Sequence, residues 1–265
     1  MKLAHSVFCL LFICGLGRSV SAQEHRFKTG ERLEYKVYYY LMGIWVSAGD
    51  VKFTVEEGVH ANQSCFHFQG VGNSHPRYNW FYEVHDTYES FSDRVKLTPF
   101  TFKRDISEGN NYMIEKCVFE EKTNKIYSVQ SLKNNPVQID TSELIPGSFD
   151  VLSMIYHARN LEFDQFTVGQ KIPLNMFIDK ETHSIFIRFL GVEIYDHDDF
   201  GALECYVFSP LLVDGTLFKS GENMKVYVTK DKNQIPVYVE SDILVGSVRI
   251  VLKSHDDLKA KLGEN

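Results

Sequence analysis

The chain has 265 residues and a net charge of −7 at pH 7, and 44% of its residues are hydrophobic. Residues 1–22 contain Lys2 and Arg18 and no acidic residue, so residues 23–265 carry a net charge of −9. This acidic balance argues against nucleic acid or anionic lipid as a partner and favours uncharged or cationic ligands.

Residues 1–22 have the pattern of a secretory signal peptide. Met1-Lys2 is a short positive start, residues 7–16 are apolar, and Val20-Ser21-Ala22 places small residues before Gln23. The apolar centre is too short to span a bilayer, and no later stretch approaches the roughly 20 apolar residues that spanning requires. We therefore expect an exported protein, periplasmic or associated with the cell envelope, with no transmembrane segment.

Beyond Phe27, most apolar segments alternate with the two-residue period of a β-strand. Gly, Asn and Asp separate the segments, and such short connections favour antiparallel neighbours. The predicted strands are 33–40, 44–56, 64–71, 80–91, 98–107, 112–122, 126–132, 172–178, 184–195, 203–213, 224–229, 235–243 and 248–253. This pattern predicts an all-β fold, a mainly antiparallel, barrel-like or strongly curved sheet.

One helix, near 149–161, interrupts the strands. The residues that recur at helical spacing are Phe149, Leu152, Ile155, Tyr156 and Arg159. Ser148 is the predicted cap, Asp150 lies in the first turn, and Arg159 is expected to pack on the sheet with its tip in solvent. We interpret 23–265 as a single β-rich domain, and two sheet halves divided near 146–160 are the alternative.

Three cysteines, Cys65, Cys117 and Cys205, follow the predicted signal peptide. Their odd number and wide spacing allow at most one disulfide, so the fold is not built on disulfides. Cys117 and Cys205 fall on apolar strand faces. We expect buried thiols rather than a bridge, because free cysteine is often a core residue.

Arg104 is the most informative residue of the predicted strands. It shares a face with Phe100, Phe102 and Ile106, and a buried charge needs a partner. If Gly109-Asn110 forms a two-residue turn, the hairpin sets Arg104 opposite Glu115.

A loop over 93–97 would also bring Asp86 of the preceding strand beside Arg104. The predicted site is then a row of Asp86, Arg104 and Glu115, which allows three interpretations. The row can be a satisfied core cluster, a ligand pocket in the mouth of a barrel, or a catalytic pair of carboxylates. Carboxylates held by one arginine have lowered pKa values, which makes them poor general acids.

Weaker candidates are Arg77, Glu108, Tyr156 and Arg159. Arg77 lies in a turn near Tyr78, Trp80 and Tyr82, where aromatic rings could stack on a sugar or simply form a rim. The acidic run 196–199 is better explained as a hairpin turn than as a calcium loop. We expect no metal site and no cofactor.

Several motifs in this order resemble the bacterial family called domain of unknown function 3108. They are residues 27–35 (FKTGERLEY), Ser47-Ala48-Gly49, Pro99-Phe100 before Arg104 and Glu108, residues 149–153 (FDVLS) with Tyr156 and Arg159, residues 225–229 (KVYVT) with Asp231, Ile235-Pro236-Val237, and residues 245–248 (VGSV). The resemblance implies an exported β-rich protein of Gram-negative bacteria, from the Bacteroides and Flavobacterium side. The family has no assigned activity, so the resemblance supplies no catalytic residues.

Motifs for nucleophilic catalysis, phosphate binding and dinucleotide binding are absent from the sequence. Our first hypothesis is a non-enzymatic binding or envelope-assembly module that holds a lipid or a glycan in the curved sheet. One alternative is a periplasmic glycan hydrolase that uses Asp86 and Glu115. Another is a structural partner of an outer-membrane complex.

Overall fold

The computed structural model describes residues 24–41, 43–78, 80, 82–133, 135–212, 221–243 and 246–264. The predicted signal peptide, 1–22, and the last residue of the predicted strand 203–213 lie outside the described residues. In the described part, strands dominate, α1 (Val151–Ala158) is the one α-helix, and η1 (Pro76–Tyr78) and η2 (Phe163–Gln165) are single 3-10 turns. The all-β prediction is confirmed.

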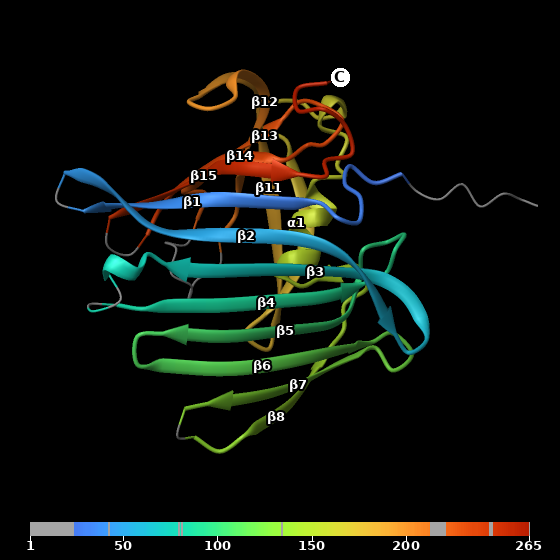
Figure 1. Ribbon diagram of the computed structural model, residues 1–265. Helices are drawn as coiled ribbons and strands as arrows, with labels where there is room; N and C mark the ends of the chain where they lie inside the picture. Colours follow the sequence, from blue (N-terminus) through green and yellow to red (C-terminus); the bar gives the residue numbers. More distant parts are fainter. Residues whose placement is uncertain are drawn as a thin grey trace, which may run out of the picture.

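Fifteen strands of the described residues form one sheet, in which the first of these strands pairs with the last (Figure 1). From β1 the chain runs outward as a meander to β8; it then crosses to β9 at the other end of the sheet and returns to β15 beside β1. All neighbours are antiparallel except β9 and β10. The strands are β1 (Arg32–Leu41), β2 (Ile44–His60), β3 (Gln63–Ser74), β4 (Val84–Ser92), β5 (Pro99–Glu108), β6 (Asn111–Glu120), β7 (Lys125–Leu132), β8 (Gln138–Glu143), β9 (Ser148–Phe149), β10 (Lys171–Ile178), β11 (Glu181–His197), β12 (Gly201–Pro210), β13 (Met224–Thr229), β14 (Pro236–Asp242) and β15 (Ser247–Asp256).

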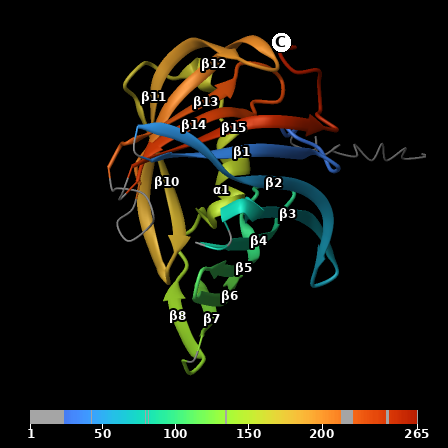
Figure 2. The same ribbon diagram turned by 60° about the vertical axis from the view of Figure 1, so that its left-hand side comes forward.

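The sheet curves around α1, which lies between β10 on one side and β3 and β4 on the other (Figure 2). At the open side, the tip of the β10–β11 hairpin reaches the inner face of β8. Lys180 Nζ lies 2.7 Å from Asp140 Oδ2, and Ser142 Oγ donates to Lys180 O at 2.8 Å. These side-chain contacts bring the two ends of the open sheet together, which makes the fold barrel-like.

Helix α1 begins one residue after its cap, Asp150, whose carboxylate accepts hydrogen bonds from Leu152 N at 2.8 Å and Ser153 N at 3.0 Å. Ser153 Oγ accepts in return from Asp150 N, which completes a capping box. The prediction that Ser148 caps the helix is therefore wrong. Ser148 and Phe149 form β9, because pairing with β10 keeps them extended.

The core consists of apolar clusters that α1 connects. Met154 packs against both the cluster of β10–β13 and that of β2–β3, and Tyr156 stacks on Phe68 with ring centroids 4.0 Å apart. Cys65, Cys117 and Cys205 are buried free thiols, as expected. Gly49 has a packing role, because a Cβ there would lie 2.2 Å from Asn73 O on β3.

Candidate functional site

Arg104 lies opposite Glu115 in the β5–β6 register, as the hairpin turn predicts. Arg104 Nε donates to Glu115 Oε2 at 2.7 Å, and the side chains are only 8% and 2% exposed. Gln130 Nε2 of β7 donates to the other oxygen, Glu115 Oε1, at 3.4 Å. The carboxylate is therefore enclosed and bonded at both oxygens.

The second carboxylate at Arg104 is Asp179, in the β10–β11 turn, and not Asp86. Arg104 Nη2 donates to Asp179 Oδ1 at 2.5 Å. Asp86 pairs with Ile106, two residues beyond Arg104 on β5. The loop is one residue longer than predicted, since Ser92 pairs with Pro99, and a bulge at Phe91/Ser92 shifts the register by one more residue.

Asp86 also differs electrostatically from the prediction. Burial raises its pKa to about 6, and the carboxylate of Glu108 acts in the same direction. A hydrogen bond of 3.1 Å from Ser107 N to Asp86 Oδ1 offsets part of this effect. The expected lowering by Arg104 is therefore wrong for this residue.

Arg104 connects parts of the sheet that are distant in the sequence. With Lys180, it ties the tip of the β10–β11 hairpin to β5, β6 and β8. Of the three predicted site residues, the structure brings Arg104 and Glu115 together and leaves Asp86 outside. The contacts account for both buried charges, so the cluster needs no ligand to satisfy it.

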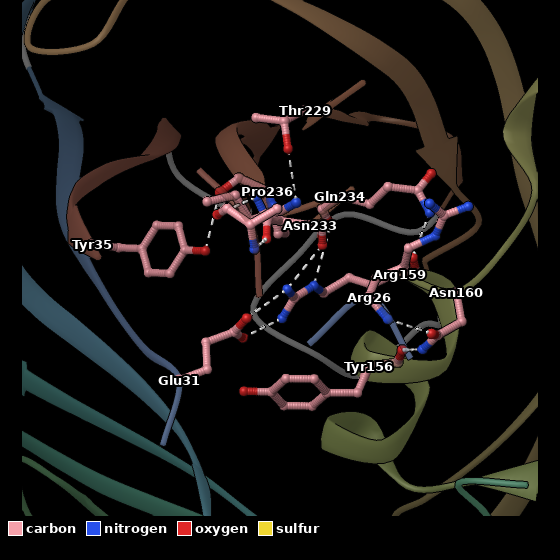
Figure 3. Close-up of polar contacts among 12 residues, drawn as sticks. Arg26, Glu31, Tyr35, Tyr156, Arg159, Asn160, Thr229, Asn233, Gln234 and Pro236 are labelled. Carbon is pink, nitrogen blue, oxygen red and sulfur yellow. Dashed lines mark hydrogen bonds and ion pairs between the residues drawn. The ribbon is translucent and has the colours of Figure 1, made fainter. Parts of the chain in front are cut away.

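Arg159 forms a second buried ion pair, shown in Figure 3. Arg159 Nη1 donates to Glu31 Oε1 at 2.5 Å, and Nη2 donates to Glu31 Oε2 at 2.9 Å and to Asn233 O at 3.0 Å. Arg159 is 2% exposed, so the expectation that its tip reaches solvent is wrong. Because Glu31 supplies a bidentate partner, the guanidinium can remain in the core.

The other weak candidates do not form one site with these pairs. Tyr156 lies in the core beside Arg159, and burial raises the pKa of its hydroxyl. Glu108, the last residue of β5, accepts a hydrogen bond of 3.4 Å from Tyr82. Arg77 lies in η1, with its guanidinium carbon 5.8 Å from the ring centroid of Tyr78.

A cleft that the sequence did not predict lies over β11, β13, β14 and β15. Its volume is about 610 Å³, and its lining includes Tyr195, Tyr227 and Tyr238 together with Lys225, Glu240 and Arg249. The three rings have centroids 5.0 to 5.7 Å apart. Lys225 and Tyr227 alternate with Val226 and Val228 of the core, so the cleft is on the opposite face of β13.

Hydrogen bonds and ion pairs order the polar groups of this cleft. Arg249 Nε lies 3.2 Å from Glu240 Oε2, and the hydroxyl of Tyr238 also donates to Glu240. Lys225 Nζ lies 3.1 Å from Glu193 Oε2, which accepts from the hydroxyl of Tyr227 at 2.8 Å. The two cations are thus each neutralised by a carboxylate while their side chains stay partly exposed.

These tyrosines are neutral hydrogen-bonding groups over the physiological pH range. Burial raises the pKa of Tyr195 to about 12, and it also raises the pKa values of Tyr227 and Tyr238. The hydrogen bond from Tyr227 lowers the pKa of Glu193, which therefore stays ionised. The cleft offers flat apolar ring faces beside hydroxyl, carboxylate and guanidinium groups.

The described residues hold no group of three or more His, Cys, Asp or Glu side chains placed to bind a metal ion. The acidic run at 196–199 ends β11 and enters the turn before β12, which confirms the hairpin interpretation. A membrane-spanning helix is likewise not found in the part of the chain that the structure describes.

The fold defines a class of barrel-like proteins built from one long, curved antiparallel sheet. The family model described as "Protein of unknown function (DUF3108)" matches residues 34–253, and the chain belongs to this family. A solved structure, the β-barrel-like protein of domain of unknown function DUF1849 from Brucella abortus, is similar with a TM-score of 0.53. That similarity covers 86% of this chain and 98% of the other at 10% identity, so it concerns the fold alone. None of the curated proteins matches the sequence.

Proposed function

We propose that the protein is an exported, non-enzymatic binding module of the Gram-negative cell envelope, and that its ligand is a glycan. The observation that carries the proposal is the cleft of Tyr195, Tyr227 and Tyr238. Its volume of about 610 Å³ is in the range of small-molecule sites. Sugar rings have one apolar C–H face and a hydroxyl edge, which suits tyrosine rings flanked by hydrogen-bonding groups.

The charges of the cleft favour an uncharged ligand. Lys225 and Arg249 are already paired with Glu193 and Glu240, so an anionic ligand would have to displace a carboxylate. A further carboxylate of the lining, Asp242, accepts a hydrogen bond of 2.9 Å from Ser247. Such oxygens accept from hydroxyl groups, which a glycan supplies in number.

A site on the outer face of the curved sheet is favoured over one on the inner face, where α1 packs. Phe68 and Tyr156 stack on each other and Phe27 packs edge-on against both, so these rings fill space between β3 and α1 that a lipid held in the curved sheet would need. Catalysis by Asp86 and Glu115 is disfavoured because Glu115 is enclosed and bonded at both oxygens. A hydrolase needs a carboxyl group that reaches the glycosidic bond.

Binding is tested by titrating uncharged and anionic oligosaccharides into the mature chain and measuring heat or ligand NMR signals. We expect the uncharged sugars to bind, and Tyr195→Ala and Tyr238→Ala to weaken them about tenfold, since stacked rings contribute roughly 1 kcal/mol or more. Tyr127→Ala, at an exposed tyrosine of β7, is the matched control. Binding of none of these sugars, or equal binding by all variants, would reject the proposal.

Export is tested separately by expressing the full chain in a Gram-negative host. We expect the protein in the periplasmic or envelope fraction, with Gln23 as its first residue by mass spectrometry. A cytoplasmic protein that keeps residues 1–22 would contradict this part of the proposal and leave the glycan site to be judged by the titration.

A further inference from the structure

The tyrosine cleft is one end of a longer row of side chains on the same face of the sheet. Tyr38, Arg249, Glu240 and Lys225 lie directly opposite one another on β1, β15, β14 and β13. Residues in direct register on neighbouring strands point to the same face. With neighbouring strands about 4.8 Å apart, the row from β2 to β13 is roughly 19 Å long.

The other end of the row is a second aromatic group. Tyr40 is opposite Trp45 in the β1–β2 register, and their ring centroids are 5.0 Å apart. The guanidinium carbon of Arg249 lies 4.0 Å from the ring centroid of Trp45. Because Arg249 also contacts Glu240, it connects this group to the cleft.

The direction of the row distinguishes between possible chain-like ligands. An extended peptide gains its affinity by pairing with the edge of a sheet, along a strand. This row runs across β2, β1, β15, β14 and β13, which are interior strands whose backbones are engaged on both sides. A chain of sugar rings needs no such backbone pairing, and it can use aromatic faces and paired charges in turn.

We propose that the row binds a linear, uncharged oligosaccharide that lies across the strands. One end stacks on Tyr195, Tyr227 and Tyr238, the middle passes over the Arg249–Glu240 pair, and the other end meets Trp45 and Tyr40. This inference rests on the proposed glycan site and extends it from a site for a short sugar to one for a chain.

The chain's two tryptophans, Trp45 and Trp80, allow a direct test. In Trp80→Phe, Trp45 is the single fluorescent tryptophan and reports contacts at the far end of the row. N-acetylated chito-oligosaccharides and cello-oligosaccharides of one to six residues, which are all uncharged, are the probes. We expect short sugars to leave Trp45 emission unchanged, longer ones to shift it, and affinity to rise about tenfold from the dimer to the hexamer.

Trp45→Ala should lower hexamer affinity about tenfold and leave dimer affinity within twofold, because the dimer reaches only the tyrosine cleft. Trp80→Ala, at a tryptophan 84% exposed in the β3–β4 connection, is the control and should bind all lengths normally. Thermal unfolding checks that both variants fold.

Equal affinities for the dimer and the hexamer, or no effect of Trp45→Ala on hexamer affinity, would overturn this inference alone. Absence of binding at every length would overturn it together with the proposed function.

Discussion

Arg159 and Glu31 join the end of α1 to the residue before β1 through a bidentate ion pair in the core. The nitrogen–oxygen distances are 2.5 and 2.9 Å, and neither side chain is more than 2% exposed. Gln234 Nε2 donates to Arg159 O at 2.6 Å, which adds the β13–β14 connection to the same junction (Figure 3). The pair therefore holds together three segments that are distant in the sequence.

Removal of one partner should strongly destabilise the fold. Glu31→Gln and Arg159→Met each leave a buried charge without its counter-ion, and we expect each to lower the free energy of unfolding by about 3 kcal/mol or more. The double variant should lose less than the sum of the two. Glu162→Gln, in the exposed pair with Arg26, is the control and should cost under about 1 kcal/mol. Urea unfolding measures all four, and a loss below about 1 kcal/mol for both single changes would contradict the structure.

Arg104 should be structural rather than ligand-binding. Arg104→Met leaves Glu115 buried and unpaired, so we expect a loss of about 3 kcal/mol of unfolding free energy with glycan affinity unchanged. Asp179→Asn removes a partner that is 54% exposed and should cost under about 1 kcal/mol. A folded Arg104→Met protein that no longer binds the oligosaccharides would reverse this assignment.

The sequence predicts local features of the site and misses those that depend on sheet order. The two-residue turn at Gly109-Asn110 is enough to place Arg104 opposite Glu115. Asp86 is misplaced because a bulge and a longer connection change the β4–β5 register, and neither has a clear sequence signal. Glu31 is 128 positions from Arg159, so no local period connects them.

The tyrosine cleft could not be predicted from the sequence for a related reason. Alternation places Lys225 and Tyr227 on one face of their strand, and Tyr238 and Glu240 on one face of the next. That much can be predicted from the sequence. Tyr195 joins this face from β11, which is separated from β13 by β12, so its position depends on the order and curvature of three strands. Trp45 joins it only because β1 pairs with β15, which brings the two meanders into one sheet.

The thiols should be unreactive in the folded protein. Cys117 and Cys205 are buried, and burial raises their pKa values to about 12, while the pKa of Cys65 is also raised. The thiolate is the reactive form, so an aromatic disulfide reagent at pH 8 should modify these residues only after unfolding. We expect three equivalents in denaturant and fewer than one without it. The count refers to residues 23–265, and rapid labelling of the three thiols in the folded protein would contradict their buried positions.

Asp150 should make the protein less stable as the pH rises from about 4 to about 6. Burial raises its pKa to about 6, although Ser90, Ser153 and Leu152 donate hydrogen bonds to the carboxylate. The folded state then binds the proton more tightly than the unfolded chain, whose aspartates titrate near 3.9, so deprotonation favours unfolding.

Asp150→Asn removes this titration and keeps an oxygen that can accept from Leu152 N and Ser153 N. The difference in unfolding free energy, wild type minus variant, should fall by about 2 kcal/mol between pH 4 and pH 7. Glu193→Gln should show a smaller trend of opposite sign, because the hydrogen bond from Tyr227 lowers the pKa of the exposed Glu193 and its stabilisation is lost as the pH falls. Urea unfolding at several pH values measures both differences. A pH-independent difference for Asp150→Asn would mean that the carboxylate is no harder to ionise in the folded protein than in the unfolded chain.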